Sequence, residues 1–228
     1  MSVASYNRCA AIEYALKWAL CRNPLYANFS GRDGDSTNFV SQCLMAGSGI
    51  NSRQPHHSWY YDCDNDHSRS WCYCDQLHNY LIRRQACGPF ACETPMEEMM
   101  PGDVIQIASR MQCFNHSLFI SDICGRPNFN NILVCAHSYN SKNRRLCTYD
   151  IQRIRFLHIQ GVTYQPPSDP CGEPFECPDQ CHAPQDRQAS FRQELCCPPN
   201  SFQQHQCCQG QQFLHGHPTP EFCQNCNF

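Results

Sequence analysis

The chain has 228 residues, with 17 Lys and Arg against 20 Asp and Glu, a formal net charge of −3, and 21 cysteines. Residues 1–164 hold 15 basic and 13 acidic side chains, and residues 165–228 hold 2 and 7, so neither part has the basic stripe of a nucleic-acid-binding protein. No apolar run reaches the length of a membrane span.

The sequence of residues 1–20 predicts a helix whose faces carry both apolar and polar side chains. They lack a basic start followed by a continuous apolar block, which argues against a secretory signal peptide. We therefore expect synthesis in the cytoplasm.

A second helix is predicted to begin near Ser36. Phe39, Val40, Cys43 and Leu44 follow it at i+3, i+4, i+7 and i+8, the spacing of one apolar helical face. Position 36 then lies at a helix N-terminus, where free amide groups and the helix dipole stabilise an anion and lower the pKa of a thiol. Two readings stay open: a nucleophile position occupied by serine, or a helix cap supplied by Asp35, Ser36 or Thr37.

Four β-prone segments follow, at residues 104–108, 116–120, 132–137 and 153–159. His116 opens the second segment, and His137 closes the third. A helix-borne nucleophile followed by histidines on neighbouring strands is the layout of a Cys-His-polar triad. The predicted fold is α+β, with N-terminal helices packed on a small antiparallel sheet.

These motifs resemble the putative amidase domain family, which belongs with the papain-like, NlpC-type and CHAP-type hydrolases. The similarity rests on several motifs in order between residues 5 and 160: Tyr6-Asn7-Arg8, Arg22-Asn23-Pro24, GDSTNFVSQCL, Ser58-Trp59-Tyr60-Tyr61, the Pro-Gly-Asp turn at 101–103 and His116-Ser117-Leu118. The resemblance implies an amidase that acts on peptide bonds of the cell wall and needs no cofactor or metal.

In that family, the motif carries a nucleophilic cysteine where this chain has Ser36. By position, His116 would be the general base, and His137 would orient it, with Asn140 as the alternative. The serine, whether natural or introduced, makes weak activity or a binding-only role the expectation, because a hydroxyl loses its proton far less readily than a thiol.

Other side chains are candidates for contact with the substrate. They are Asp35, Asn38, Trp59 and Tyr60. The competing readings are capping for Asp35 and ordinary aromatic packing for residues 59–61. His158 is expected to be structural, and Cys9, Cys43 and Cys135 are expected to act as small core residues.

Proline interrupts all periodicity at residues 165–170, which separates an amidase-like domain (1–164) from a tail (165–228). The tail is rich in Cys, Gln and Pro and poor in branched aliphatic residues, so it is predicted to have little regular structure. Its nine cysteines favour disulfide cross-linking, including self-association, with zinc as the competing account at Cys177-x3-Cys181-His182 and Cys223-x2-Cys226.

Three function classes follow: a peptidoglycan amidase, an inactive relative that still binds such a substrate, and a Cys-rich structural protein of a coat layer. Abundant cysteine without a signal peptide suits the spore surface, where proteins made in the mother cell become cross-linked after assembly.

Overall fold

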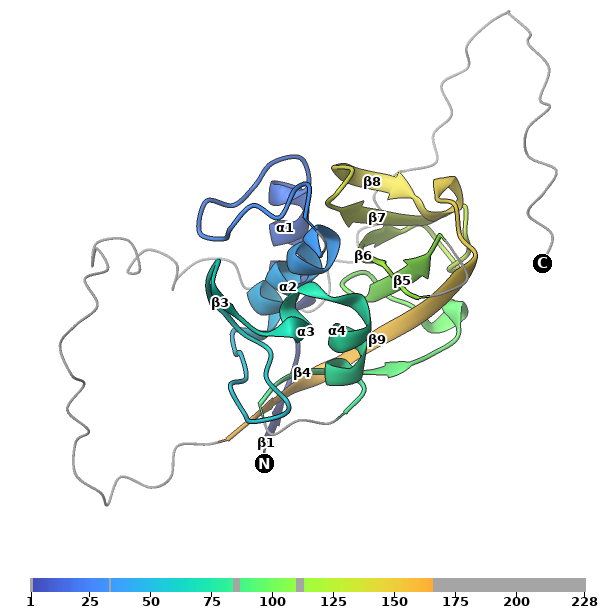
Figure 1. Ribbon diagram of the computed structural model, residues 1–228. Helices are drawn as coiled ribbons and strands as arrows, with labels where there is room; N and C mark the ends of the chain where they lie inside the picture. The colour runs from blue at the N-terminus through green and yellow to red at the C-terminus, as the bar shows by residue number, and fades with distance from the viewer. Residues whose placement is uncertain (1, 33, 84–86, 110–112, 166–228) are drawn as a thin grey trace, which may run out of the picture. The chain divides into compact units, whose positions relative to one another are not determined.

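Helices pack against one face of an antiparallel sheet (Figure 1). The computed structural model describes residues 2–32, 34–83, 87–109 and 113–165. In chain order, its elements are β1 (Ser2–Ala4), α1 (Arg8–Trp18), α2 (Asp35–Ser48), β2 (Tyr61–Cys63), β3 (Asp66–His67), α3 (Arg69–Cys72), α4 (Cys74–Leu81), β4 (Gly88–Glu93), η1 (Met96–Glu98), β5 (Val104–Ala108), β6 (His116–Ile123), β7 (Ile132–Ala136), β8 (Ser141–Arg145), η2 (Leu146–Thr148) and β9 (Arg153–Tyr164).

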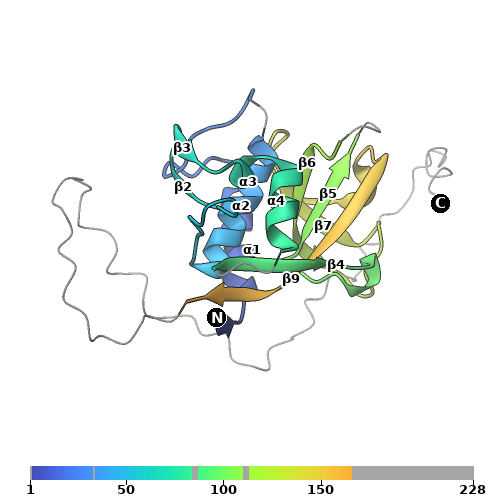
Figure 2. The ribbon, with the colours of Figure 1, turned by 60° about the horizontal axis from the view of Figure 1, so that its bottom comes forward.

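The sheet has the order β1-β9-β5-β6-β7-β8, and β4, which lies off this path, also pairs with the long β9. Every pairing between described strands is antiparallel. The prediction of helices on an antiparallel sheet is confirmed, and all four predicted strands are present as β5, β6, β7 and β9. The sequence did not predict β1, β4 or β8. Figure 2 shows the long β9 running beside β4 below the helices.

Alternation along the strands creates two cores. On β6, Phe119 faces the helices and packs in one cluster with Phe39 and Leu44 of α2. Leu118 and Ile120 face the other way, into a second cluster that η1, η2 and the adjoining loops cover. The sheet is thus buried on both faces, which fixes the register of β6 and with it the position of His116.

Asp103 joins the N-terminal helix to the sheet. Its fully buried carboxylate pairs with Arg8 (2.7 Å) and His158 (2.9 Å), and it also accepts the backbone N–H groups of Met100 and Ile159. These donors compensate the desolvation of the carboxylate. The structural role predicted for His158 is confirmed.

Cysteine burial follows the prediction at two positions of three. Cys43 and Cys135 are fully buried, whereas Cys9 is exposed, so the core role predicted for Cys9 is wrong. Cys9 lies on the face of α1 opposite Ala11 and Ala15, the buried positions of that helix.

No helix in the described ranges combines the length and apolar character needed to cross a bilayer. The tail prediction falls on residues 165–228, of which only Gln165 is described.

Candidate active site

Ser36 lies in the first turn of α2, where it is 2% exposed. Its Oγ accepts a hydrogen bond of 3.2 Å from the backbone N–H of Ser117. Ser117 directly follows His116, so the fold brings the predicted nucleophile position to the start of the strand that His116 opens. Among the described residues, no hydrogen bond joins Ser36 to His116.

The His116 ring faces a cavity of about 360 Å³, whose walls include Asn115, Ser138 and Arg144. It also lies 6.0 Å from the Tyr149 ring, between centroids. The pKa of His116 is lowered to about 4, first by burial and then by the Arg144 guanidinium, against the opposing effect of the Asp35 carboxylate. His116 is therefore neutral at pH 7 and a weak base.

His137 is 1% exposed, and its ring stacks on Phe39 with a centroid distance of 4.0 Å. Its Nε2 lies 2.9 Å from the Trp18 carbonyl oxygen, so this nitrogen carries the proton and donates. Its Nδ1 has no partner among the described residues. Burial is the main reason that its pKa falls to about 4.

The described residues contain no hydrogen bond between His137 and His116, so the orienting role stays a prediction. The alternative residue, Asn140, accepts a hydrogen bond from Arg22 (2.8 Å) and donates to the Leu20 carbonyl (3.4 Å). His137 is thus held by the last residue of α1, and Asn140 by the segment that follows this helix.

Asp35 connects the start of α2 to the turn after β7. Its Oδ2 accepts hydrogen bonds from Arg22 (2.8 Å) and from the backbone N–H of Ser138 (2.9 Å). The capping role is wrong for Asp35, Ser36 and Thr37 alike, because the cap residue is Gly34 and no side chain caps this helix. Gly34 has φ = 96°, a left-handed conformation that glycine adopts without strain.

Sequence reasoning missed Arg22 as a site residue. Its side chain reaches Asp35, Ser30 and Asn140, and so supports the start of α2 from outside the helix. The motif Arg22-Asn23-Pro24 was a signal for it, since this motif forms part of the family resemblance.

A buried polar cluster behind Ser36 was also missed. The Thr37 hydroxyl lies 2.9 Å from Ser117 Oγ and 3.2 Å from the thiol of Cys74. Gln106 donates to Ser117 Oγ (3.1 Å) and accepts from Arg155 (2.8 Å). Burial raises the pKa of the Cys74 thiol, although its hydrogen bonds with Ser117 and Thr37 act in the opposite direction. Cys74 is therefore a poor nucleophile beside the site.

Asn38 and Trp59 do not reach a substrate surface. Asn38 is fully buried, and its Oδ1 accepts a hydrogen bond from the Trp71 indole N–H (2.8 Å). Trp59 is fully buried as well, donates to Ser41 Oγ (3.1 Å) and stacks on Tyr80 at 5.7 Å. Their predicted contact with a substrate is corrected to packing between α2, α3 and α4.

Tyr60 differs from its neighbour because it is half-buried. Its hydroxyl donates to Asp66 (2.9 Å), and the Arg53 guanidinium lies over its ring. Contact between Tyr60 and a substrate stays a prediction.

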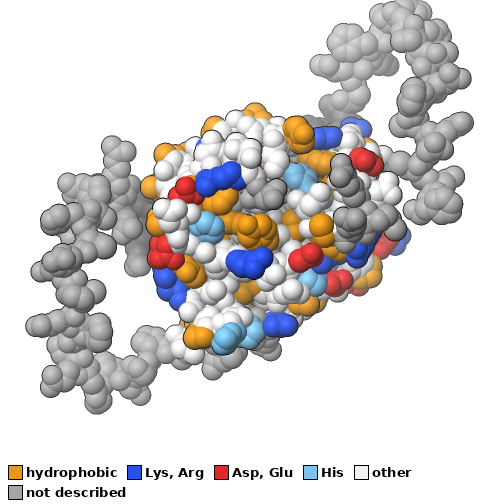
Figure 3. All heavy atoms as spheres, in the orientation of Figure 1, with side chains coloured by type: hydrophobic (Ala, Val, Ile, Leu, Met, Phe, Trp, Pro, Cys, Tyr) orange, Lys and Arg blue, Asp and Glu red, His pale blue; other side chains and the backbone are white. Residues whose placement is uncertain are grey.

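In the described part of the chain, charge and metal-ligand patterns give no further evidence for the candidate active site. On the face shown in Figure 3, basic and acidic side chains are interspersed. No cluster of three or more His, Cys, Asp or Glu side chains within the described ranges fits a metal ion. The two zinc half-sites of the tail lie outside these ranges.

The chain matches the model of the family described as "Putative amidase domain" over residues 5–159. It is also 34% identical over 164 residues to "Uncharacterized protein YhbB" of Bacillus subtilis (strain 168), an alignment that covers 72% of this chain and 48% of that protein. The chain thus spans about half the length of the curated relative that it matches. No solved structure matches the chain. The family match includes α2, with Ser36, and the strands that carry His116 and His137, and the chain belongs to the Putative amidase domain family.

Proposed function

We propose that this chain is a papain-like, NlpC-type amidase domain that binds peptides of the bacterial cell wall and hydrolyses them weakly or not at all. Ser36 stands where the family resemblance puts the nucleophile, at the start of α2. Family membership and the meeting of α2 with β6 support the proposal.

The main observation that supports low activity is the hydrogen bonding of Ser36. Its hydroxyl oxygen accepts the Ser117 N–H and, among the described residues, makes no hydrogen bond to His116. A serine becomes nucleophilic only when an adjacent base accepts its proton as it attacks. A histidine with a pKa of about 4 is also poorly matched to general-base catalysis near pH 7.

A cysteine at the same place would need less help. The first turn of α2 offers free backbone N–H groups and the positive end of the helix dipole, which stabilise a thiolate. Proton loss from a thiol also requires a weaker base than proton loss from a hydroxyl. We therefore expect Ser36→Cys to raise amide hydrolysis by at least about a hundredfold.

The test compares the chain as written with Ser36→Cys and Ser36→Ala on soluble peptidoglycan fragments, by following the amines released. Binding of the same fragments is measured by calorimetry. The expected results are binding by all three proteins and turnover by Ser36→Cys alone. Adding His116→Gln to Ser36→Cys should abolish the gain, because the base is then absent.

Two results would contradict the proposal. Rapid turnover by the unmodified chain, blocked by a serine-directed reagent at Ser36, would make it a true serine hydrolase. Absence of binding by all three proteins would remove the amidase-like function and leave the structural one.

The structural function is the second candidate, as a cross-linked protein of a spore coat. The 21 cysteines favour it. In the described domain, the Cys21, Cys63 and Cys113 side chains are exposed to solvent, where they are accessible to disulfide exchange. Disulfide-linked self-association through the tail is part of this proposal.

A further inference from the structure

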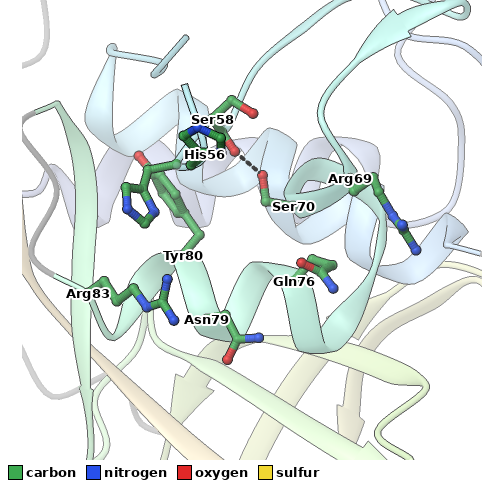
Figure 4. A pocket seen from close by; sticks show the side chains of 9 residues that line it. His56, Ser58, Arg69, Ser70, Gln76, Asn79, Tyr80 and Arg83 are labelled. Atoms are coloured by element: carbon green, nitrogen blue, oxygen red, sulfur yellow. Dashed lines mark hydrogen bonds between the residues drawn. The ribbon is translucent and has the colours of Figure 1, made fainter. Parts of the chain in front are cut away.

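A polar pocket of about 380 Å³ lies between α3, α4 and the loop that carries His56 and Ser58 (Figure 4). Three of its side chains come from one face of α4 and its end: Gln76, Asn79 and Arg83, spaced by three and four residues. Arg69 of α3 stands at the other end of this row, opposite Arg83 (Figure 4).

The pocket is rich in donors and lacks negative charge. None of its lining residues is acidic. Within the described ranges, neither Arg69 nor Arg83 forms an ion pair, so no carboxylate of the described residues neutralises the pocket. Arg69 packs over the Tyr73 ring at 5.5 Å, which orients the guanidinium without neutralising it.

We propose that this pocket binds an oxyanion, a carboxylate or a phosphate group. The guanidinium presents paired N–H donors that match the two oxygens of such a group, and the Gln76 and Asn79 amides add neutral donors between the two arginines. Because the two arginines stand at opposite ends of the row (Figure 4), a single oxyanion pairs with one of them and lowers the net positive charge of the pocket.

The place of the pocket connects it to the candidate site. Arg69 and Gln76 also line a second cavity, of about 440 Å³, whose walls include Thr37 and Asn115, the neighbours of Ser36 and His116. From Gln76 to Arg83, the helical rise amounts to about 10 Å, the length of roughly three extended residues. A peptide that occupies the second cavity, beside Gln76, would therefore need about three further residues to reach Arg83. This connection rests on the proposed function, whereas the binding of the oxyanion does not.

The test is an NMR titration of the full chain with inorganic phosphate and, separately, with glutarate, at ionic strength held constant with KCl. Saturable shifts are expected at the backbone amides of α3 and α4. The double variant Arg69→Gln/Arg83→Gln should raise the apparent Kd for the anion at least tenfold. Gln76→Glu, which places a carboxylate in the pocket, should do the same.

The matched control is Arg126→Gln/Arg145→Gln, which removes the same charge from two exposed positions outside the pocket. Its Kd should stay within twofold of the original. Saturation by glutarate alone identifies a carboxylate site, by phosphate alone a phosphate site, and by both a general oxyanion site. Shifts that rise linearly with either anion, or that are equal in the pocket variant and the control, would refute the proposal. No cell-wall fragment or turnover enters this titration, so its failure would not affect the amidase test.

Discussion

The two histidines of the candidate site should make folding stability depend on pH, and His137→Gln isolates the contribution of His137. This ring is 1% exposed, and its pKa is lowered from 6.5 to about 4, mainly by burial. Glutamine does not titrate, and its side-chain amide is able to donate to the Trp18 carbonyl as the imidazole does.

The sign follows from the direction of the pKa shift. Well above pH 6.5, the histidine is neutral in both states and adds no pH dependence. As the pH falls, the unfolded state takes up a proton that the folded state resists, so stability is lost until the pH passes below about 4. At pH 4.5, the unfolded side chain is almost fully protonated and the folded one is about one quarter protonated. This difference corresponds to a loss of about 2–3 kcal/mol relative to pH 7.5.

The assay is urea unfolding of the original chain and of His137→Gln at several pH values between 7.5 and 4.5. The variant is less stable at pH 7.5, since it loses the stacking on Phe39, but its stability should fall less steeply. The difference between the two free energies of unfolding should therefore shrink by about 2–3 kcal/mol over this range, and the contributions of the histidines common to both proteins cancel. A difference that stays constant with pH would show that the His137 ring is not held neutral by burial.

Three further predictions concern the support of the site and the tail. Arg22→Ala leaves the Asp35 carboxylate, which is 1% exposed, without its cation and should lower the free energy of unfolding in urea by about 3 kcal/mol. Arg32→Ala removes the cation of a pair with Asp64 in which both side chains are about half exposed, and it should lower this free energy by less than about 1 kcal/mol. Equal losses for the two variants would contradict the argument. Gly34→Ala should lower stability by at least about 2 kcal/mol, seen as a drop in Tm, because φ is +96° and the new Cβ would lie 2.6 Å from the Cys72 carbonyl oxygen; an unchanged Tm would mean that the turn relaxes freely. Deletion of residues 166–228 should leave the thermal transition within a few degrees and remove most disulfide-linked multimers on a non-reducing gel, and a truncated chain that does not fold would refute the division into domain and tail.

The sequence predicted those elements whose period is local. The apolar spacing after Ser36 and the β-prone runs that begin at His116 and Ile132 are short-range patterns, and each became the expected helix or strand. β4 was missed because its sequence, Gly88–Glu93, contains a proline and shows no alternation. It is a strand because β9 pairs with it, and a partner about 70 residues away leaves no local signal.

The candidate site shows the same limit. The order of Ser36 and His116 along the chain, together with the family resemblance, predicted that their segments meet, and the hydrogen bond from the Ser117 N–H to Ser36 joins these segments. The burial of Trp59 involves a hydrogen bond to Ser41 Oγ and stacking on Tyr80. The local run of aromatic residues identifies neither partner. The same holds for Arg22, whose role appears only when the start of α2 comes close to it.

The pairing of β1 with the far end of β9 has a mechanical consequence. Ser2 lies opposite Tyr164 and Ala4 opposite Val162, so the two ends of the described fold sit side by side on an antiparallel ladder. A pull between these ends opens such a ladder from its tip, one residue pair after another, and never loads all its hydrogen bonds together. Each step costs only about 1 kcal/mol. Under tension β1 should therefore peel away first, while the pairing of β9 with β5, which holds the sheet under Ser36 and His116, bears little load.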